Sequence, residues 1–161
     1  MVNDLLLILH KITRDKMIQR IQSLLLLVSG LGFVGQFFTD FAVSTASIPQ
    51  LLADQHYEVQ DSPILMALTI IGALACITAI ATYKNRLLQK RITILSLVAS
   101  ILLPAVAYFL MFREASPIPA GAQVMDTLGM YLPALSISLS ALALRFIKKD
   151  DQLVKSMDRL R

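Results

Sequence analysis

The chain has 161 residues, of which 56% are hydrophobic and 16% are charged, whereas soluble domains carry about 25% charged residues. Its formal net charge is +4 and its mean hydropathy is +0.66. This composition argues against an ordinary soluble domain, and the single cysteine, Cys76, excludes an internal disulfide. An integral membrane protein is therefore the first hypothesis.

Residues 1–16 read MVNDLLLILHKITRDK, and their apolar run is too short to cross a bilayer. Two interpretations are open. The segment is a cytoplasmic amphipathic helix on the membrane surface, or it is an extension upstream of a native start at Met17.

Four later segments have the length and composition of membrane-spanning helices, which need ~20 mostly apolar residues. They run from Ile18 or Ile21 to Phe38, from Pro63 to Tyr83, from Ile92 to Phe112 and from Leu128 to Ile147. We predict an all-α fold in which residues 17–147 form one antiparallel bundle of four transmembrane helices. An alternative treats the first segment as a signal peptide, cleaved near residues 44–46, which leaves three helices.

The basic residues predict the orientation of this bundle. Fourteen of the 15 lysines and arginines lie before the first span, between the second and third, or from Arg145 onward. The positive-inside rule then places both termini in the cytoplasm and suggests a bacterial inner-membrane location. The predicted topology anchors are Arg20, Lys84, Arg86, Lys90, Arg91 and Arg145. Since these cations are split among short segments without interleaved aromatics, we expect no nucleic-acid partner.

The loops on the other side carry start and stop signals. SIPQLLADQHY, in the loop from Thr39 to Ser62, predicts one short helix with Ser47 as its cap and Pro49 in its first turn. The motif Asp61-Ser62-Pro63 predicts the start of the second span. EASPIPAGAQ predicts an irregular loop, after which Asp126 or Thr127 caps the fourth span.

No cluster of side chains predicts catalysis or a cofactor. On the predicted short helix, Asp54 and Glu58 share a face and His56 points away, which is too few converging ligands for a metal. The serines at 136, 138 and 140 have no general base at their depth, so no catalytic triad is expected. The centres of the spans carry no Asp, Glu, Lys or His, which argues against a proton-coupled transporter acting alone. We therefore expect neither an enzyme nor a bound cofactor.

Small residues recur at three- and four-residue spacing in every span, which lets helices approach closely in lipid. They are Ser29, Gly30, Gly32 and Gly35; Gly72, Ala75 and Ala79; Ser96, Ala99 and Ser100; and Ala134, Ser138 and Ala141. Two interpretations are open: packing within one bundle, or a docking face for another membrane protein or a second copy. Pro104 and Pro133 are expected to kink the third and fourth spans.

The C-terminal segment, residues 148–161, is the strongest candidate for a contact with a partner. Apolar residues recur at near-helical spacing in RFIKKDDQLVKSMDRLR, so helix four is predicted to continue into the cytoplasm as an amphipathic helix. The alternatives for this tail are packing on its own loops or lying on lipid. The candidate partner-contact residues are Lys148, Lys149, Asp151, Leu153, Lys155, Met157 and Arg159.

Both ends of residues 17–161 resemble a known family. The start Met17-Ile18-Gln19-Arg20-Ile21-Gln22 and the ending from Lys148-Lys149-Asp150 to Leu160-Arg161 resemble the bacterial membrane family called domain of unknown function 4293. The resemblance implies a four-helix inner-membrane protein and supplies no activity. Members usually begin at the equivalent of Met17, from which residues 1–16 depart.

Together these patterns predict a structural or accessory membrane subunit. It would contact the bilayer, membrane partners through small-residue faces, and a cytoplasmic protein through its tail. The alternative is a binder or transporter of a small molecule or lipid, acting as an oligomer through a pocket near Pro104 and Pro133.

Overall fold

The computed structural model describes residues 21–48, 52–114 and 122–158, with side chains as far as residue 152 apart from that of 114. Four of its helices are long and apolar enough to cross a membrane. The first helix is helical over residues 21–35 and runs on as a 3-10 turn, η1 (Gln36–Phe38). It is followed by α2 (Pro63–Ala81), α3 (Arg86–Glu114) and α4 (Leu128–Asp158).

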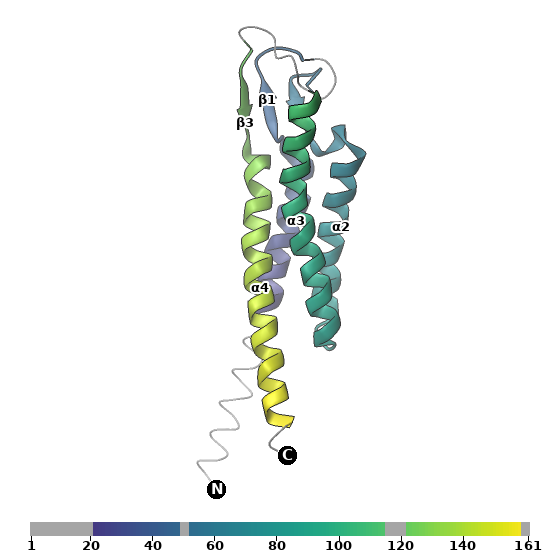
Figure 1. Cartoon of the computed structure of the whole chain (residues 1–161), viewed down its shortest axis with the longest axis vertical. Coiled ribbons are helices and arrows are strands. Elements are labelled where there is room, and N and C mark those ends of the chain that lie inside the picture. The colour runs from purple at the N-terminus through teal and green to yellow at the C-terminus, as the bar shows by residue number, and fades with distance from the viewer. Residues whose placement is uncertain (1–20, 49–51, 115–121, 159–161) are drawn as a thin grey trace.

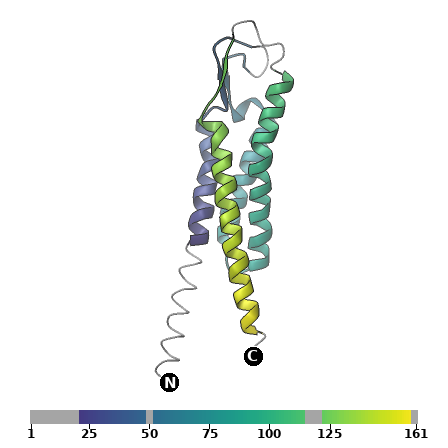
Figure 2. The same cartoon turned by 60° about the vertical axis from the view of Figure 1, so that its left-hand side comes forward.

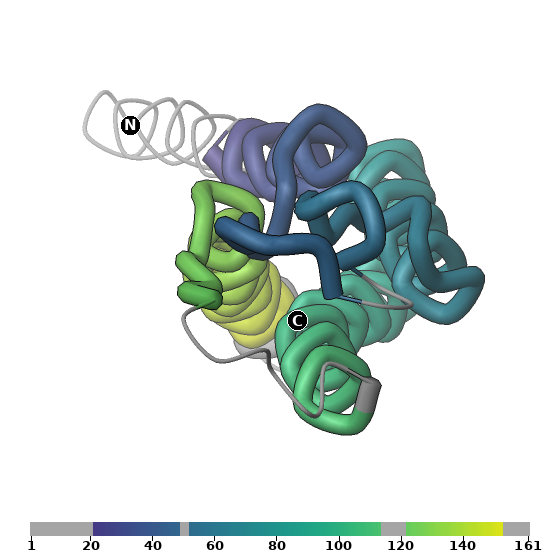
Figure 3. Tube along the Cα trace, turned by 90° about the horizontal axis from the view of Figure 1, so that it is seen from above, coloured from purple at the N-terminus to yellow at the C-terminus, as the bar shows by residue number. Residues whose placement is uncertain are grey.

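The helices form an antiparallel bundle in which each packs beside the next in sequence, and α4 closes the ring against the first (Figure 3). The α2–α3 turn lies at one end of the bundle, here called the turn end, and the strands lie at the other, the strand end (Figures 1 and 2). The first helix and α3 are diagonal neighbours. Both run from the turn end to the strand end.

Local sequence explains where the helices begin. Pro63 is the first residue of α2 and Ser62 is its N-cap, as the motif predicts. At the turn end, the Asn85 side chain accepts a hydrogen bond from the Leu88 N–H at 3.2 Å. This caps α3, which therefore begins six residues before the predicted boundary at Ile92. At the strand end, α4 begins at Leu128, as predicted.

The prediction of an all-α fold is wrong at the strand end. A small antiparallel sheet in the order β2-β1-β3 joins β1 (Ala42–Ser44), β2 (His56–Tyr57) and β3 (Val124–Asp126). In its register Ala42 faces both Tyr57 and Asp126. Such short strands lack the alternating pattern that reveals a strand in a sequence, and they are formed by pairing across the two loops.

The predicted short helix at Ser47 is also wrong within the described residues. Ile48 pairs with Leu52 in an isolated β-bridge, and the Ser47 hydroxyl donates to the Ala53 carbonyl at 2.7 Å instead of capping a helix. Gln55, at φ 73°, then turns the chain into β2. Leu52 is buried in the core beneath this turn.

Two apolar clusters fill the bundle at different depths. The larger lies towards the strand end and includes Phe33, Phe41, Tyr57 and Leu103. There the Tyr57 hydroxyl donates to the Ala107 carbonyl at 3.1 Å, which ties the sheet to α3. The smaller cluster, nearer the turn end, is built on Leu26, Ala79 and Ala143.

Candidate functional site

Charge separates the two ends of the molecule. The described cations Lys84, Lys90, Arg91, Arg145, Lys148 and Lys149 lie at the turn end, and all but the half-buried Lys90 are exposed. The described acids of the two loops, Asp40, Asp54, Glu58, Asp61 and Asp126, lie at the strand end with one exposed cation, Arg113. The predicted anchors are therefore brought together at one end, except Arg20, which lies outside the described residues.

One predicted anchor, Arg86, has a partner inside the protein. Its guanidinium Nη1 forms an ion pair with Asp150 Oδ2, which joins the start of α3 to α4. The Asp150 side chain is 5% exposed and that of Arg86 is 20% exposed. A carboxylate this buried is stable only when it is paired, so the pair fixes the position of α4 just beyond its apolar span.

The predicted tail continues α4 without a break, because the helix extends to Asp158. Lys148 and Lys149 are exposed on it, and Asp151 is half-buried. The side chains of Leu153, Lys155 and Met157 lie outside those described, and Arg159 lies outside the described residues. The exposed part of the tail next to the bundle is therefore cationic, since the neighbouring Asp150 is paired inward.

A cluster of hydroxyls and one thiol joins all four helices in the middle of the bundle. We call Ser29, Cys76, Ser96, Ser136 and Ser140 the serine–cysteine cluster, and each of its members is buried. Ser29 Oγ lies 2.9 Å from Ser140 Oγ, and Cys76 Sγ lies 3.0 Å from Ser96 Oγ. Ser136 Oγ donates to the Ser29 carbonyl at 3.1 Å. Since these groups hydrogen-bond to one another, the cluster holds the four helices together.

Three buried glutamines, Gln22, Gln36 and Gln89, accompany this cluster, and the sequence alone assigned a role to none of them. Gln22, Ser29 and Gln36 are all buried and lie seven residues apart on the first helix, and Gln89 lies seven residues before Ser96 on α3. Gln36 Nε2 donates to the Gly129 carbonyl at 3.0 Å. Because seven residues make about two helical turns, this spacing places the polar side chains on one face of each helix.

The polar side chains lie in layers separated by apolar ones. Leu26, Ala79 and Ala143 separate the glutamines at the turn end from the serine–cysteine cluster on the first helix, α2 and α4, whereas on α3 the buried Thr93 lies between Gln89 and Ser96. Phe33 and Leu103 lie between that cluster and the strand end. The polar groups therefore stabilise the packing of the helices.

The small-residue faces point inward on three helices and outward on the fourth. Ser29, Gly32, Gly72, Ala75, Ala79, Ser96, Ala99 and Ser100 are buried. Gly72 is needed because a Cβ there would lie 2.3 Å from Phe33 Cε1. On α4, Ala134 and Ser138 are turned away from the core and Ala141 is half-buried, whereas Ser136 and Ser140 face the core. Packing within the bundle therefore explains the first three faces and not the fourth.

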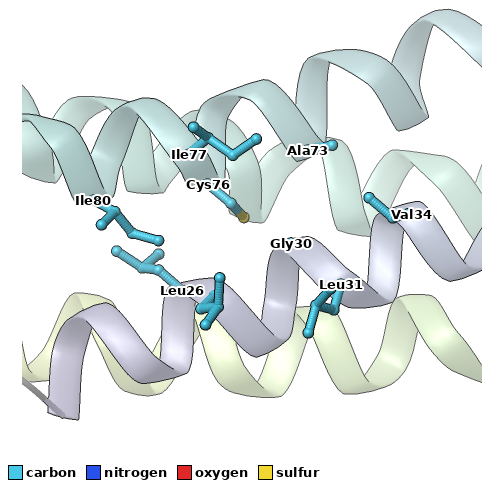
Figure 4. Close-up of a pocket in the computed structure, with 9 residues that line it drawn as sticks. Leu26, Gly30, Leu31, Val34, Ala73, Cys76, Ile77 and Ile80 are labelled. Atoms are coloured by element: carbon cyan, nitrogen blue, oxygen red, sulfur yellow. The ribbon is translucent and has the colours of Figure 1, made fainter.

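A shallow groove of about 100 Å³ runs between the first helix and α2 on the outer surface (Figure 4). Its lining is apolar and includes Leu31, Val34 and Ile77, with Gly30 and Cys76 at the close approach of the two helices. The groove lies away from Pro104 and Pro133, so it is not the pocket predicted near them.

Two acidic side chains of the first loop, Asp40 and Asp54, contact His56 of β2. His56 Nδ1 lies 2.7 Å from Asp40 Oδ2, and Asp54 Oδ1 accepts the His56 backbone N–H at 3.2 Å. The hydrogen bond to Asp40 raises the pKa of His56 above its ordinary value of 6.5. Glu58 and Asp61 instead form the capping box of η2 (Val59–Asp61). Among the described residues, no group of three or more His, Cys, Asp or Glu is placed to hold a metal ion.

Comparison with known proteins identifies a family and adds no activity. No curated protein and no solved structure matches the chain. The model of one family, described as Domain of unknown function (DUF4293), matches residues 18–160. This range covers all four long helices and the described tail. The chain therefore belongs to the DUF4293 family.

Proposed function

We propose that this protein is an accessory subunit located in the bacterial inner membrane. It docks a cytoplasmic protein through the extension of α4. The observation that carries the proposal is the continuous helix from Leu128 to Asp158, which outruns its apolar span and is held at its exit by the Arg86–Asp150 pair. The helix therefore projects rigidly beyond the bundle. A membrane helix that served only as a span would need no such extension.

The charge separation supports an orientation with both termini in the cytoplasm. The exposed cations of the turn end belong on the cytoplasmic side by the positive-inside rule, and the acidic strand end on the other. A reporter that is active only outside the cytoplasm tests this when it is fused after Asp54 or after Asn85. We expect activity from the first fusion alone. Activity from the second fusion, or from both, would contradict the orientation.

The docking partner is expected to present an acidic surface, because Lys148 and Lys149 are exposed while the neighbouring Asp150 is paired inward. Affinity purification in mild detergent, with quantitative mass spectrometry, tests this on the full chain and on a chain ending after Gln152. The shorter chain keeps Asp150, so its bundle remains closed. We expect a specific protein that is lost from the shorter chain and that recovers the full chain when it is itself tagged.

A matched pair of variants separates docking from general charge. Lys148→Ala/Lys149→Ala is expected to reduce recovery of that protein, whereas Lys84→Ala, an exposed cation of the α2–α3 turn, leaves it unchanged. The same set of proteins from every form would count against a docking tail. Loss of anionic lipid rather than of a protein would assign the tail to the membrane surface.

The outer groove favours a second candidate, a lipid binder. Its apolar lining between the first helix and α2 suits an acyl chain (Figure 4). Native mass spectrometry tests whether lipid stays bound after detergent exchange. We expect Val34→Phe, which fills the groove, to release lipid that Leu95→Phe on the exposed face of α3 retains. Equal retention by both variants would remove this candidate.

A further inference from the structure

Two buried glutamines at the turn end each have a polar atom without a partner among the described residues. The atoms are Nε2 of Gln22, a donor, and Oε1 of Gln89, an acceptor. Both side chains are 1% exposed. One comes from the first helix and the other from α3, which face each other diagonally in the bundle (Figure 3).

The two amides lie in the same layer of the bundle. Ser29 and Ser96 are at one depth, because Ser140 Oγ lies 2.9 Å from the first hydroxyl and 3.5 Å from the second. Gln22 precedes Ser29 by seven residues and Gln89 precedes Ser96 by seven. Because the two helices run in the same direction, both glutamines lie two turns, about 10.5 Å, below the serine–cysteine cluster on the same inward face.

Between these amides and the serine–cysteine cluster, the described residues include one buried polar side chain, Thr93, whose hydroxyl already donates to the Gln89 backbone carbonyl at 2.9 Å. Leu26, Ala79 and Ala143 pack between them and the serine–cysteine cluster. On α4, the buried residue two turns beyond Ser140 is Ile147. An unpaired amide group in hydrocarbon surroundings costs several kcal/mol, and here the two unpaired atoms are complementary, one donor and one acceptor.

We propose that a bound water molecule bridges Gln22 and Gln89. The water accepts a hydrogen bond from Gln22 Nε2 and donates one to Gln89 Oε1, which meets the minimum of about two partners for a buried water. It joins two helices that are not adjacent in the ring.

The test uses the full chain in lipid bilayers and solid-state NMR with magnetisation transferred from water. We expect a water cross-peak to the side-chain amide of Gln22 in the native protein, and its loss in Gln89→Leu. Absence of the cross-peak in the native protein, or its survival in Gln89→Leu, would overturn the proposal. A direct contact between the two amides without a water signal would do the same.

Stability provides a second, independent measurement. Each of Gln22→Leu and Gln89→Leu leaves the water and the other amide without a hydrogen-bond partner. Each variant is therefore expected to lower the folding equilibrium constant by about 5- to 30-fold. The double variant is expected to cost at least about tenfold less than the product of the singles. Gln22→Leu with Ser100→Ala, in another layer, is the additive control. Additivity in both pairs would contradict a shared water.

Discussion

Gln36 Nε2 donates to the carbonyl oxygen of Gly129 at 3.0 Å, and that carbonyl is open because the residue four positions later is Pro133. In an uninterrupted helix the N–H of residue 133 would bond to it, but proline has no N–H. The Gln36 side chain therefore supplies the hydrogen bond to Gly129 that Pro133 cannot donate. The same turn is held by Gly129 N–H, which donates to the Asp40 carbonyl at 3.0 Å.

This relationship predicts a coupling between Gln36 and Pro133. Gln36→Leu is expected to lower the free energy of unfolding by about 1–3 kcal/mol, because it leaves the buried Gly129 carbonyl without its side-chain donor. In a Pro133→Ala background the loss is expected to be smaller, because the substituted alanine supplies the backbone N–H that proline lacks. Denaturant unfolding in mixed micelles, followed by circular dichroism, measures both losses. Equal losses in the two backgrounds would contradict a coupling between Gln36 and Pro133.

The close approach of the first helix and α2 predicts that a side chain at position 72 destabilises the bundle. A Cβ at Gly72 would lie 2.3 Å from Phe33 Cε1, whereas one at Gly30 would lie 3.2 Å from Cys76 Cβ. Gly72→Ala is expected to cost about 1–3 kcal/mol, because the Phe33 ring must leave its place in the core. Gly30→Ala serves as the matched control with a smaller effect. Thermal unfolding of both variants checks the order, and a reversed order would be inconsistent with it.

The ion pair at the turn end predicts a strong penalty for removing one partner. Asp150→Leu is expected to lower the free energy of unfolding by about 3 kcal/mol, because Arg86 is left partly buried without its counter-charge. Arg86→Met/Asp150→Leu is expected to regain much of that loss, since no charge remains to be compensated. Lys149→Gln, on the exposed face of the same turn, is the control. The double-variant cycle is measured by unfolding in detergent, and additive losses would argue against the pair.

The His56–Asp40 contact predicts a pH dependence of the strand end. Because Asp40 raises the pKa of His56 above 6.5, the contact stabilises the fold fully below that pH, and the stabilisation is lost as the pH rises through the raised pKa. The difference in thermal midpoint between the native protein and Asp40→Asn should therefore be largest just below pH 6.5, where His56 is protonated and Asp40 is ionised, and should shrink as the pH rises. NMR titration of His56 should give a lower pKa in Asp40→Asn. An unchanged pKa would count against the contact.

The four helices could be predicted from the sequence because each depends on its own length and apolarity. The start of α2 at Pro63 and the continuation of α4 past Ile147 are equally local. The sheet could not be predicted in this way, because Ala42 pairs with Tyr57 and Asp126, which come from distant parts of the chain. The bonds that orient those strands are visible only when both loops are brought together.

The interior of the bundle was predictable only in part for the same reason. Small residues were recognised, but spacing alone did not say which face of α4 would be buried. Ser138 makes a hydrogen bond within its own helix to the Ala134 carbonyl at 2.9 Å, while Ser136 and Ser140 bond to the first helix. The two kinds of serine look alike in sequence. Their partners distinguish them.

The serine–cysteine cluster has a consequence for how the chain assembles. Each helix contributes only one or two of its polar groups, so each remains apolar enough to insert into the bilayer on its own. The hydroxyls then act after insertion, when the helices associate. A helix rotated by one residue, or shifted by one turn, turns its hydroxyl towards lipid or an apolar layer. The cluster thus selects one rotation and one axial position for each of four helices that are otherwise similarly apolar.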